Sequence, residues 1–178
     1  MRNDTLCEGL DNPRVAANLC AVPMPYRRED ALAKIAADWR AWPHEVSLGI
    51  FLRASTRARH VGGIALKNRS DRARGLELGY WVAEPYWGRG IAVEAGRAVI
   101  EHAFLTWRLD RLHAGHYVDN PRSGRVLERL GFARTGEISV YARDETRPNV
   151  RCVEFELHRS DWTRHWRHRQ GPPDRAAA

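Results

Sequence analysis

The chain has little lysine, few cysteines and no long apolar run. Of its 29 basic residues only Lys34 and Lys67 are lysines, which leaves 27 arginines. No stretch approaches the roughly 18 apolar residues of a membrane-spanning helix, and the first residues do not form a basic segment followed by an apolar one. We therefore expect no membrane span, no signal-directed secretion and a cytoplasmic location.

The formal net charge of +7 is compatible with binding to nucleic acid. The arginines are dispersed, however, and carboxylates alternate with most of them, which disfavours a nucleic-acid partner. Cys7, Cys20 and Cys152 are odd in number, widely spaced and not flanked by His or Cys. This pattern predicts thiols in a reducing compartment and no metal site.

A chain of 178 residues is about one domain in length. Segment 28–40 spaces Ala31, Ile35 and Trp39 four residues apart, which predicts an amphipathic helix that ends before Pro43. From Val46 the pattern alternates every second residue. Three runs then predict strands in an antiparallel meander, because their connections are short: SLGIFLRA, HVGGIALKN and GLELGYWVA.

A second half follows, with helices and strands alternating. After Gly90 the helical pattern IAVEAGRAVIEHAFLTW precedes a strand RLHAGHYV, a short helix SGRVLERL and two final strands, FARTGEISVY and VRCVEFELHR. This order predicts a mixed α/β (α+β) fold with one core. We expect a single domain over residues 1–162 and a frayed polar tail over residues 163–178.

The strand GLELGYWVA runs into a turn that contains Gly88 and Gly90, and the turn runs straight into a helix. Glycine lacks a Cβ, so backbone N–H groups here can close on an anion, and the helix start adds further donors. This geometry suits a pyrophosphate, although a plain strand–turn–helix connection explains two glycines equally well. A Walker loop is absent, and Val93 stands where a Rossmann fingerprint needs its third glycine.

Further motifs lie downstream in a fixed order: Asn120-Pro121-Arg122-Ser123, Leu130-Gly131-Phe132 and a closing Asp161-Trp162. Together with Gly79-Tyr80-Trp81 and the segment 87–95, they resemble the GNAT N-acetyltransferases, specifically the RimJ/RimL-like branch. The resemblance covers about residues 12–162. It implies a mostly antiparallel sheet splayed at a central strand pair, and transfer of an acetyl group from acetyl-CoA to a primary amine, either a protein N-terminus or a small molecule.

The resemblance also implies which residues bind acetyl-CoA. Trp81 and Val82 would line the pantetheine arm, Asn120 could bind a pantetheine amide, and Arg125 could reach the 3′-phosphate. The pyrophosphate would lie on the turn and helix start, at Trp87, Gly88, Arg89, Gly90, Ile91 and Ala92. One departure is Pro85, which stands at the first position of the family's glycine pattern and offers no polar side chain there.

Acetyl transfer requires a neutral amine. At pH 7 an α-amino group costs roughly 1.4 kcal/mol to deprotonate and a lysine roughly 4.6 kcal/mol, and a carboxylate can take the proton. By resemblance Glu77 is the candidate base, Ser123 a hydrogen-bond donor to the departing sulfur, and Asn120 a further catalytic candidate. The alternatives are a surface carboxylate paired with Arg74 for Glu77, and helix capping for Ser123 and Asn120.

Two questions stay open at the level of sequence. A non-catalytic CoA-binding or basic nucleic-acid-binding module is the alternative class of function. The family normally begins with a strand before its first helix, whereas this chain opens with the helix-like DTLCEGL. SLGIFLRA is therefore expected at a sheet edge, covered by a second subunit in a homodimer or by a strand encoded upstream of the assigned gene start.

Overall fold

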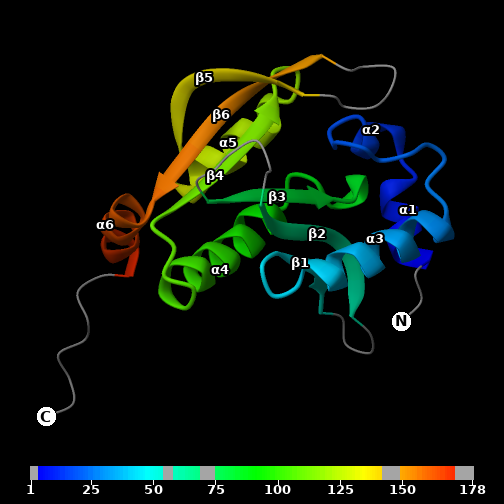
Figure 1. Ribbon diagram of the computed structural model, residues 1–178, viewed down its shortest axis with the longest axis horizontal. Helices are drawn as coiled ribbons and strands as arrows, with labels where there is room; N and C mark the ends of the chain where they lie inside the picture. Colours follow the sequence, from blue (N-terminus) through cyan, green and yellow to red (C-terminus); the bar gives the residue numbers. More distant parts are fainter. Residues whose placement is uncertain (1–3, 54–57, 69–74, 142–148, 171–178) are drawn as a thin grey trace, which may run out of the picture.

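The computed structural model describes residues 4–53, 58–68, 75–141 and 149–170. Within them the chain alternates between helices and strands in an order close to that expected from the sequence (Figure 1). The elements are α1 (Asp4–Leu10), α2 (Pro13–Ala16), α3 (Arg28–Ala41), β1 (Val46–Leu52), β2 (Arg59–Asn68), β3 (Leu76–Val82), the 3-10 helix η1 (Glu84–Tyr86), α4 (Ile91–Leu105), β4 (Arg111–Tyr117), α5 (Pro121–Leu130), β5 (Ala133–Tyr141), β6 (Val150–His158) and α6 (Arg159–Gln170).

The six strands form one sheet in the order β1-β2-β3-β4-β6-β5. All neighbours are antiparallel except β3 and β4, which are parallel and pair at two positions alone, Leu76 with Leu112 and Glu77 with His113. Beyond Glu77 the strands part. The predicted mixed α/β fold, with a mostly antiparallel sheet splayed at a central strand pair, is confirmed.

Side chains alternate along β3 between two buried clusters, as the pleat of a strand requires. Leu78 and Tyr80 face the larger cluster, which α4, α5, β6 and Trp162 of α6 complete. Trp81 faces a smaller cluster formed by the N-terminal helical segment, with Leu10 and Val15 at its centre. The central strand is therefore covered on both faces, by α4 and α5 on one and by α1–α3 on the other.

Helix α3 forms where the sequence predicts it, but its apolar residues do not pack as an amphipathic stripe. Ala31 is fully buried, whereas Ile35 is 46% and Trp39 80% exposed. The expectation of a buried stripe is wrong beyond Ala31, because the next turns of α3 pass over a cavity and the sheet edge rather than over a core. Asp38 ties this part of the helix to the sheet through Lys67 of β2, at 2.7 Å.

Two element boundaries also differ from expectation. Helix α5 begins at Pro121 with Asn120 as its N-cap, two residues before the expected start at Ser123. Helix α6 continues to Gln170, so residues 163–170 are helical rather than frayed. The remainder of the expected tail, 171–178, lies outside the described residues. In the described part of the chain no helix combines the length and the apolar character needed to cross a membrane.

Strand β1 lies at one edge of the sheet and pairs with β2 alone among the described strands. Its position confirms that SLGIFLRA forms an edge. Leu48 and Phe51 on this strand are 49% and 48% exposed. Figure 1 shows α3 running beside β1 at the same end of the molecule, so the exposed side chains of both elements lie near one another.

Candidate functional site

A large cavity follows the parted strands from the glycine turn toward α3 and β1. Its volume is about 2360 Å³, larger than the roughly 300–1,000 Å³ of a typical ligand pocket. The turn residues Trp87–Ala92, Glu77 on β3 and Asn120, Ser123 and Arg125 from the α5 region all line it. The cavity therefore gathers nearly every residue that the sequence singled out, and it has room for two substrates.

Glu77 stands where the two central strands separate. It is the last residue of β3 that pairs with β4, it is half-buried, and it lines the cavity. Its neighbour on β2 is Lys67, directly opposite in the antiparallel register. The alternative pairing with Arg74 concerns a residue outside the described part of the chain. The position suits a base, because a carboxylate here faces both the opened strands and the cavity.

A charged network covers the cavity on the α3 side. The carboxylate of Asp38 accepts hydrogen bonds from Lys34 at 2.6 Å and Lys67 at 2.7 Å, and its side chain is 17% exposed. Burial alone would raise the pKa of Asp38, but the two lysines outweigh burial and lower it. Asp38 is therefore a carboxylate engaged in holding α3 over the sheet.

The glycine turn has the conformation that an anion site needs. Gly88 and Gly90 adopt φ values of +75° and +78°, a region that favours glycine, and a Cβ built on either would meet no atom within 4 Å. Gly90 is the N-cap of the 15-residue helix α4, whose first residue Ile91 is buried. The turn thus leaves open space beside a helix N-terminus, which fits a phosphate-bearing group.

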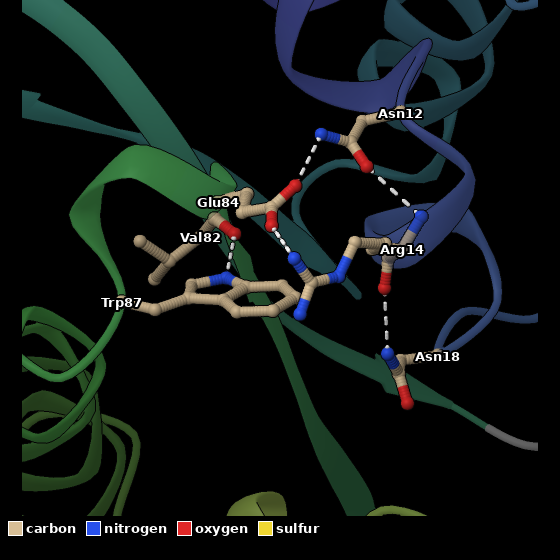
Figure 2. Close-up of polar contacts among 6 residues, drawn as sticks. All are labelled: Asn12, Arg14, Asn18, Val82, Glu84 and Trp87. Atoms are coloured by element: carbon tan, nitrogen blue, oxygen red, sulfur yellow. Dashed lines mark hydrogen bonds and ion pairs between the residues drawn. The ribbon is translucent and has the colours of Figure 1, made fainter.

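Trp81, Val82 and Trp87 form the wall between this turn and β3. The Trp81 indole packs against Gly9 and Gly63, where added Cβ atoms would lie 2.7 and 2.6 Å from its ring. The Trp87 indole N–H donates to the Val82 carbonyl at 2.6 Å (Figure 2). This bond fixes Trp87 at the start of the turn, and it engages a carbonyl of the strand end that the resemblance assigns to the pantetheine arm.

Ser123 enters the cavity from the third position of α5. Its backbone N–H lies 3.4 Å from the Asn120 side-chain oxygen, so Asn120 performs the capping role that was its alternative. Ser123 is not the cap. Its Oγ lies 2.7 Å from the Tyr80 hydroxyl of β3, and burial raises the pKa of Tyr80 to about 12 against a smaller lowering by this bond.

The sequence did not single out several residues that the structure brings to the site. Tyr80 entered only as part of a motif, although strand alternation from Leu78 places it on the α5 side. Asn12, Arg14 and Asp38 come from the α2 and α3 segments, and no local pattern marks a contact made across 29 to 72 residues. Among the described residues no cluster of His, Cys, Asp or Glu has the arrangement of a metal site.

Sequence comparison identifies relatives of this chain. The family "Acetyltransferase (GNAT) domain" matches residues 3–133. The Bacillus subtilis (strain 168) protein named "Putative ribosomal N-acetyltransferase YdaF" is 38% identical over 134 residues, which cover 72% of this chain and 69% of that protein. The Escherichia coli (strain K12) "[Ribosomal protein uS5]-alanine N-acetyltransferase" is 35% identical over 85 residues, covering 46% of this chain and 42% of that one.

Solved structures share the fold. The Vibrio cholerae spermidine N-acetyltransferase, in complex with CoA and spermine, superposes with a TM-score of 0.71 at 17% identity and covers 92% of this chain and 94% of its own. An acetyltransferase structure from T. thermophilus gives 0.72 at 25% identity, covering 92% and 85%. With the family match spanning well over half of its length, the chain belongs to the GNAT acetyltransferase family, in the RimJ/RimL-like branch.

Proposed function

We propose that this chain transfers an acetyl group from acetyl-CoA to a primary amine, and that the α-amino group of a protein N-terminus is the acceptor. The observation that carries the proposal is the parting of β3 and β4 directly after Glu77, inside a cavity that continues to the glycine turn. The α-amino group is favoured because it loses its proton more readily than a lysine. Relatives named for ribosomal-protein acetylation support the same acceptor class.

The described residues divide the work along the cavity. Backbone N–H groups of Gly88–Ala92 would hold the pyrophosphate, Arg125 the 3′-phosphate, and the Trp81–Val82 strand end the pantetheine arm. When bound, acetyl-CoA supplies the thioester carbonyl. Glu77 takes the proton from the amine, directly or through a water, as the N–C bond forms and the C–S bond breaks. The Ser123 hydroxyl donates a hydrogen bond to the departing sulfur.

Release of the CoA thiol with a panel of acceptors tests this function. Peptides that begin with alanine or serine represent protein N-termini, and spermidine represents small amines. We expect release with the peptides. Release with spermidine alone would overturn the acceptor class, and binding of acetyl-CoA without release on any amine would favour a non-catalytic CoA-binding module.

The role of Glu77 has a separate test with a matched control. Glu77→Gln should lower the rate mainly below pH 8, where the amine is protonated and needs a base. Glu137→Gln changes an exposed glutamate of β5 outside the cavity and should leave the rate unchanged. An equal loss at every pH would contradict the role as base and indicate that Glu77 positions the acceptor.

We also propose that the protein acts in the cytoplasm and forms a homodimer. The location is supported by relatives named for ribosomal-protein substrates. The dimer is supported by the edge position of β1 and by the exposed apolar side chains that accompany it on α3. An edge strand of this kind invites pairing with a second chain.

A further inference from the structure

A polar connection joins the N-terminal helical segment to the glycine turn. The Glu84 carboxylate, in η1 just before the turn, accepts a hydrogen bond from Asn12 at 2.8 Å and forms an ion pair with the Arg14 guanidinium (Figure 2). Asn12 is also the N-cap of α2, where its side chain accepts from the Arg14 N–H at 2.9 Å. Helix α2 and the start of the turn are therefore held as one unit across about 70 residues of sequence.

Arg14 lies against the residue that begins the turn. Its guanidinium carbon is 5.8 Å from the centre of the Trp87 ring, and that of Arg122 of α5 is also 5.8 Å from it. Both distances fall within the range of a cation–π contact. Trp87 itself is fixed by its bond to Val82. Two arginines, from opposite ends of the sequence, thus flank the first residue of the turn.

The Arg14 side chain retains capacity for a second anion. It lines the cavity and is 67% exposed, and its contact with Glu84 is made through Nη1. A guanidinium carries five N–H donors in a planar fork, so one carboxylate does not saturate it. Glu84, at 27% exposure, holds the fork beside the turn without enclosing it. An anion on the turn would meet an arginine that is already oriented.

We infer that Arg14 is a further ligand of the cofactor pyrophosphate, contributed by α2 and positioned by Glu84. The inference rests on the proposed function, because it takes acetyl-CoA as the ligand of the turn. It goes beyond it in one respect: binding of the cofactor fastens the N-terminal helical segment onto the turn. The pyrophosphate is the phosphate concerned, since Arg14 contacts Trp87 at the start of the turn.

Calorimetry with CoA and with 3′-dephospho-CoA tests the assignment. Arg14→Gln should weaken both ligands by the same factor, about ten- to thirtyfold, as expected for a lost charge-assisted hydrogen bond. Arg40→Gln, an exposed arginine of α3 outside the cavity, should leave both affinities unchanged. Loss confined to CoA would overturn the pyrophosphate assignment in favour of the 3′-phosphate, and unchanged affinities would overturn the inference.

Two further measurements separate positioning from charge alone. Glu84→Gln should weaken CoA by about three- to tenfold, because Arg14 loses its anchor; tighter binding would show that Glu84 acts only as an unfavourable charge. Hydrogen exchange at residues 13–16 should slow on addition of CoA to the native protein and not to Arg14→Gln. If the native protein binds no CoA, the proposed function fails; if it binds CoA and Arg14 has no effect, this inference alone fails.

Discussion

The Tyr80 hydroxyl of β3 lies 2.7 Å from Ser123 Oγ of α5 and 3.1 Å from the Ser123 carbonyl oxygen. A phenol has one proton, so it can donate to only one of these oxygens at a time. When it donates to Oγ, the serine proton is released for another acceptor in the cavity. With a pKa raised to about 12, Tyr80 keeps its proton throughout the neutral range.

Tyr80→Phe should lower the free energy of unfolding by about 1 kcal/mol, since it removes a buried hydrogen bond between β3 and α5. Tyr26→Phe provides the contrast, because the Tyr26 hydroxyl is buried without a hydrogen-bond partner among the described residues. Its removal should be neutral or stabilising. Urea unfolding of the two variants measures both effects, and equal destabilisation would contradict the assigned bond.

Ser123→Ala should reduce turnover by only a few-fold and leave acetyl-CoA affinity within a few-fold of the native value. The reason is that a serine hydroxyl is a weak acid and acts here by hydrogen bonding to the sulfur. Steady-state kinetics with a reactive acceptor, combined with calorimetry, separates the two quantities. Because Asn120 rather than Ser123 caps α5, an unchanged rate would leave Ser123 with its bond to Tyr80 as its only role.

Gly88→Val and Gly90→Val should each abolish binding of acetyl-CoA in calorimetry, with affinity falling more than about a hundredfold. A Cβ branch at either position enters open space beside the turn, where the pyrophosphate would lie. Valine at a positive φ also adds backbone strain of about 1–2 kcal/mol. Gly136→Val controls for strain, since Gly136 has φ +84°, open space around it and no place in the cavity wall.

The Gly136 variant should bind acetyl-CoA normally while losing similar stability. Unchanged affinity in the Gly88 and Gly90 variants would remove the turn from the cofactor site. Equal loss of affinity in all three variants would show that strain, rather than occupied space, is responsible.

Periodicity predicted the strands and α4 because each buries one face against a neighbour, and burial of a face leaves its pattern in the sequence. It failed on α3, where Ile35 and Trp39 have helical spacing but no core beneath them. Spacing reveals that a face is apolar and cannot reveal what covers it. The same limit applies to α6, whose mostly polar residues 163–170 carry no apolar periodicity although they are helical.

The candidate site divides in a similar way. The turn at Gly88–Gly90 and the Asn120–Ser123 segment were predicted because each is a local motif with its own spacing. Arg14 and Asp38 were not, because their partners Glu84 and Lys67 lie 70 and 29 residues away. Contacts of that kind depend on how the sheet is ordered, which the sequence alone did not supply.

Asp38→Asn should lower the free energy of unfolding by about 1 kcal/mol at pH 7, because Lys34 and Lys67 lose their common carboxylate. The folded-state pKa of Asp38 is lowered from 3.8, so its contribution is complete above that value and is lost as pH falls through the lower, folded value. Urea unfolding from pH 7 down to pH 3 should therefore show the difference between native and variant shrinking below about pH 4. A constant difference would mean that the charge of Asp38 is not involved.

The two edges of the sheet differ in ways that predict where a second subunit binds. At β1 the exposed Leu48 and Phe51 continue into Trp39 of α3, and the strand keeps a regular register over residues 46–50 before a single shift. At the opposite edge, β5 carries exposed Ile138 and Val140, but its pairing is interrupted over residues 135–137. A long interruption protects an edge from pairing, whereas a regular apolar stretch promotes it. Two copies of β1 can pair antiparallel about a two-fold axis, which makes the contact self-complementary.

Light scattering after size-exclusion chromatography should accordingly give twice the 20.4 kDa of one chain. Phe51→Lys should return the protein to a monomer, because a lysine on an edge strand opposes pairing. Ile138→Lys places the same charge on the other edge, at a side chain of similar exposure, and should leave the dimer intact. A native monomer, or a dimer broken by the Ile138 variant and not by the Phe51 variant, would assign the β1 edge no partner, and its apolar side chains would then be available to the acceptor that enters the neighbouring cavity.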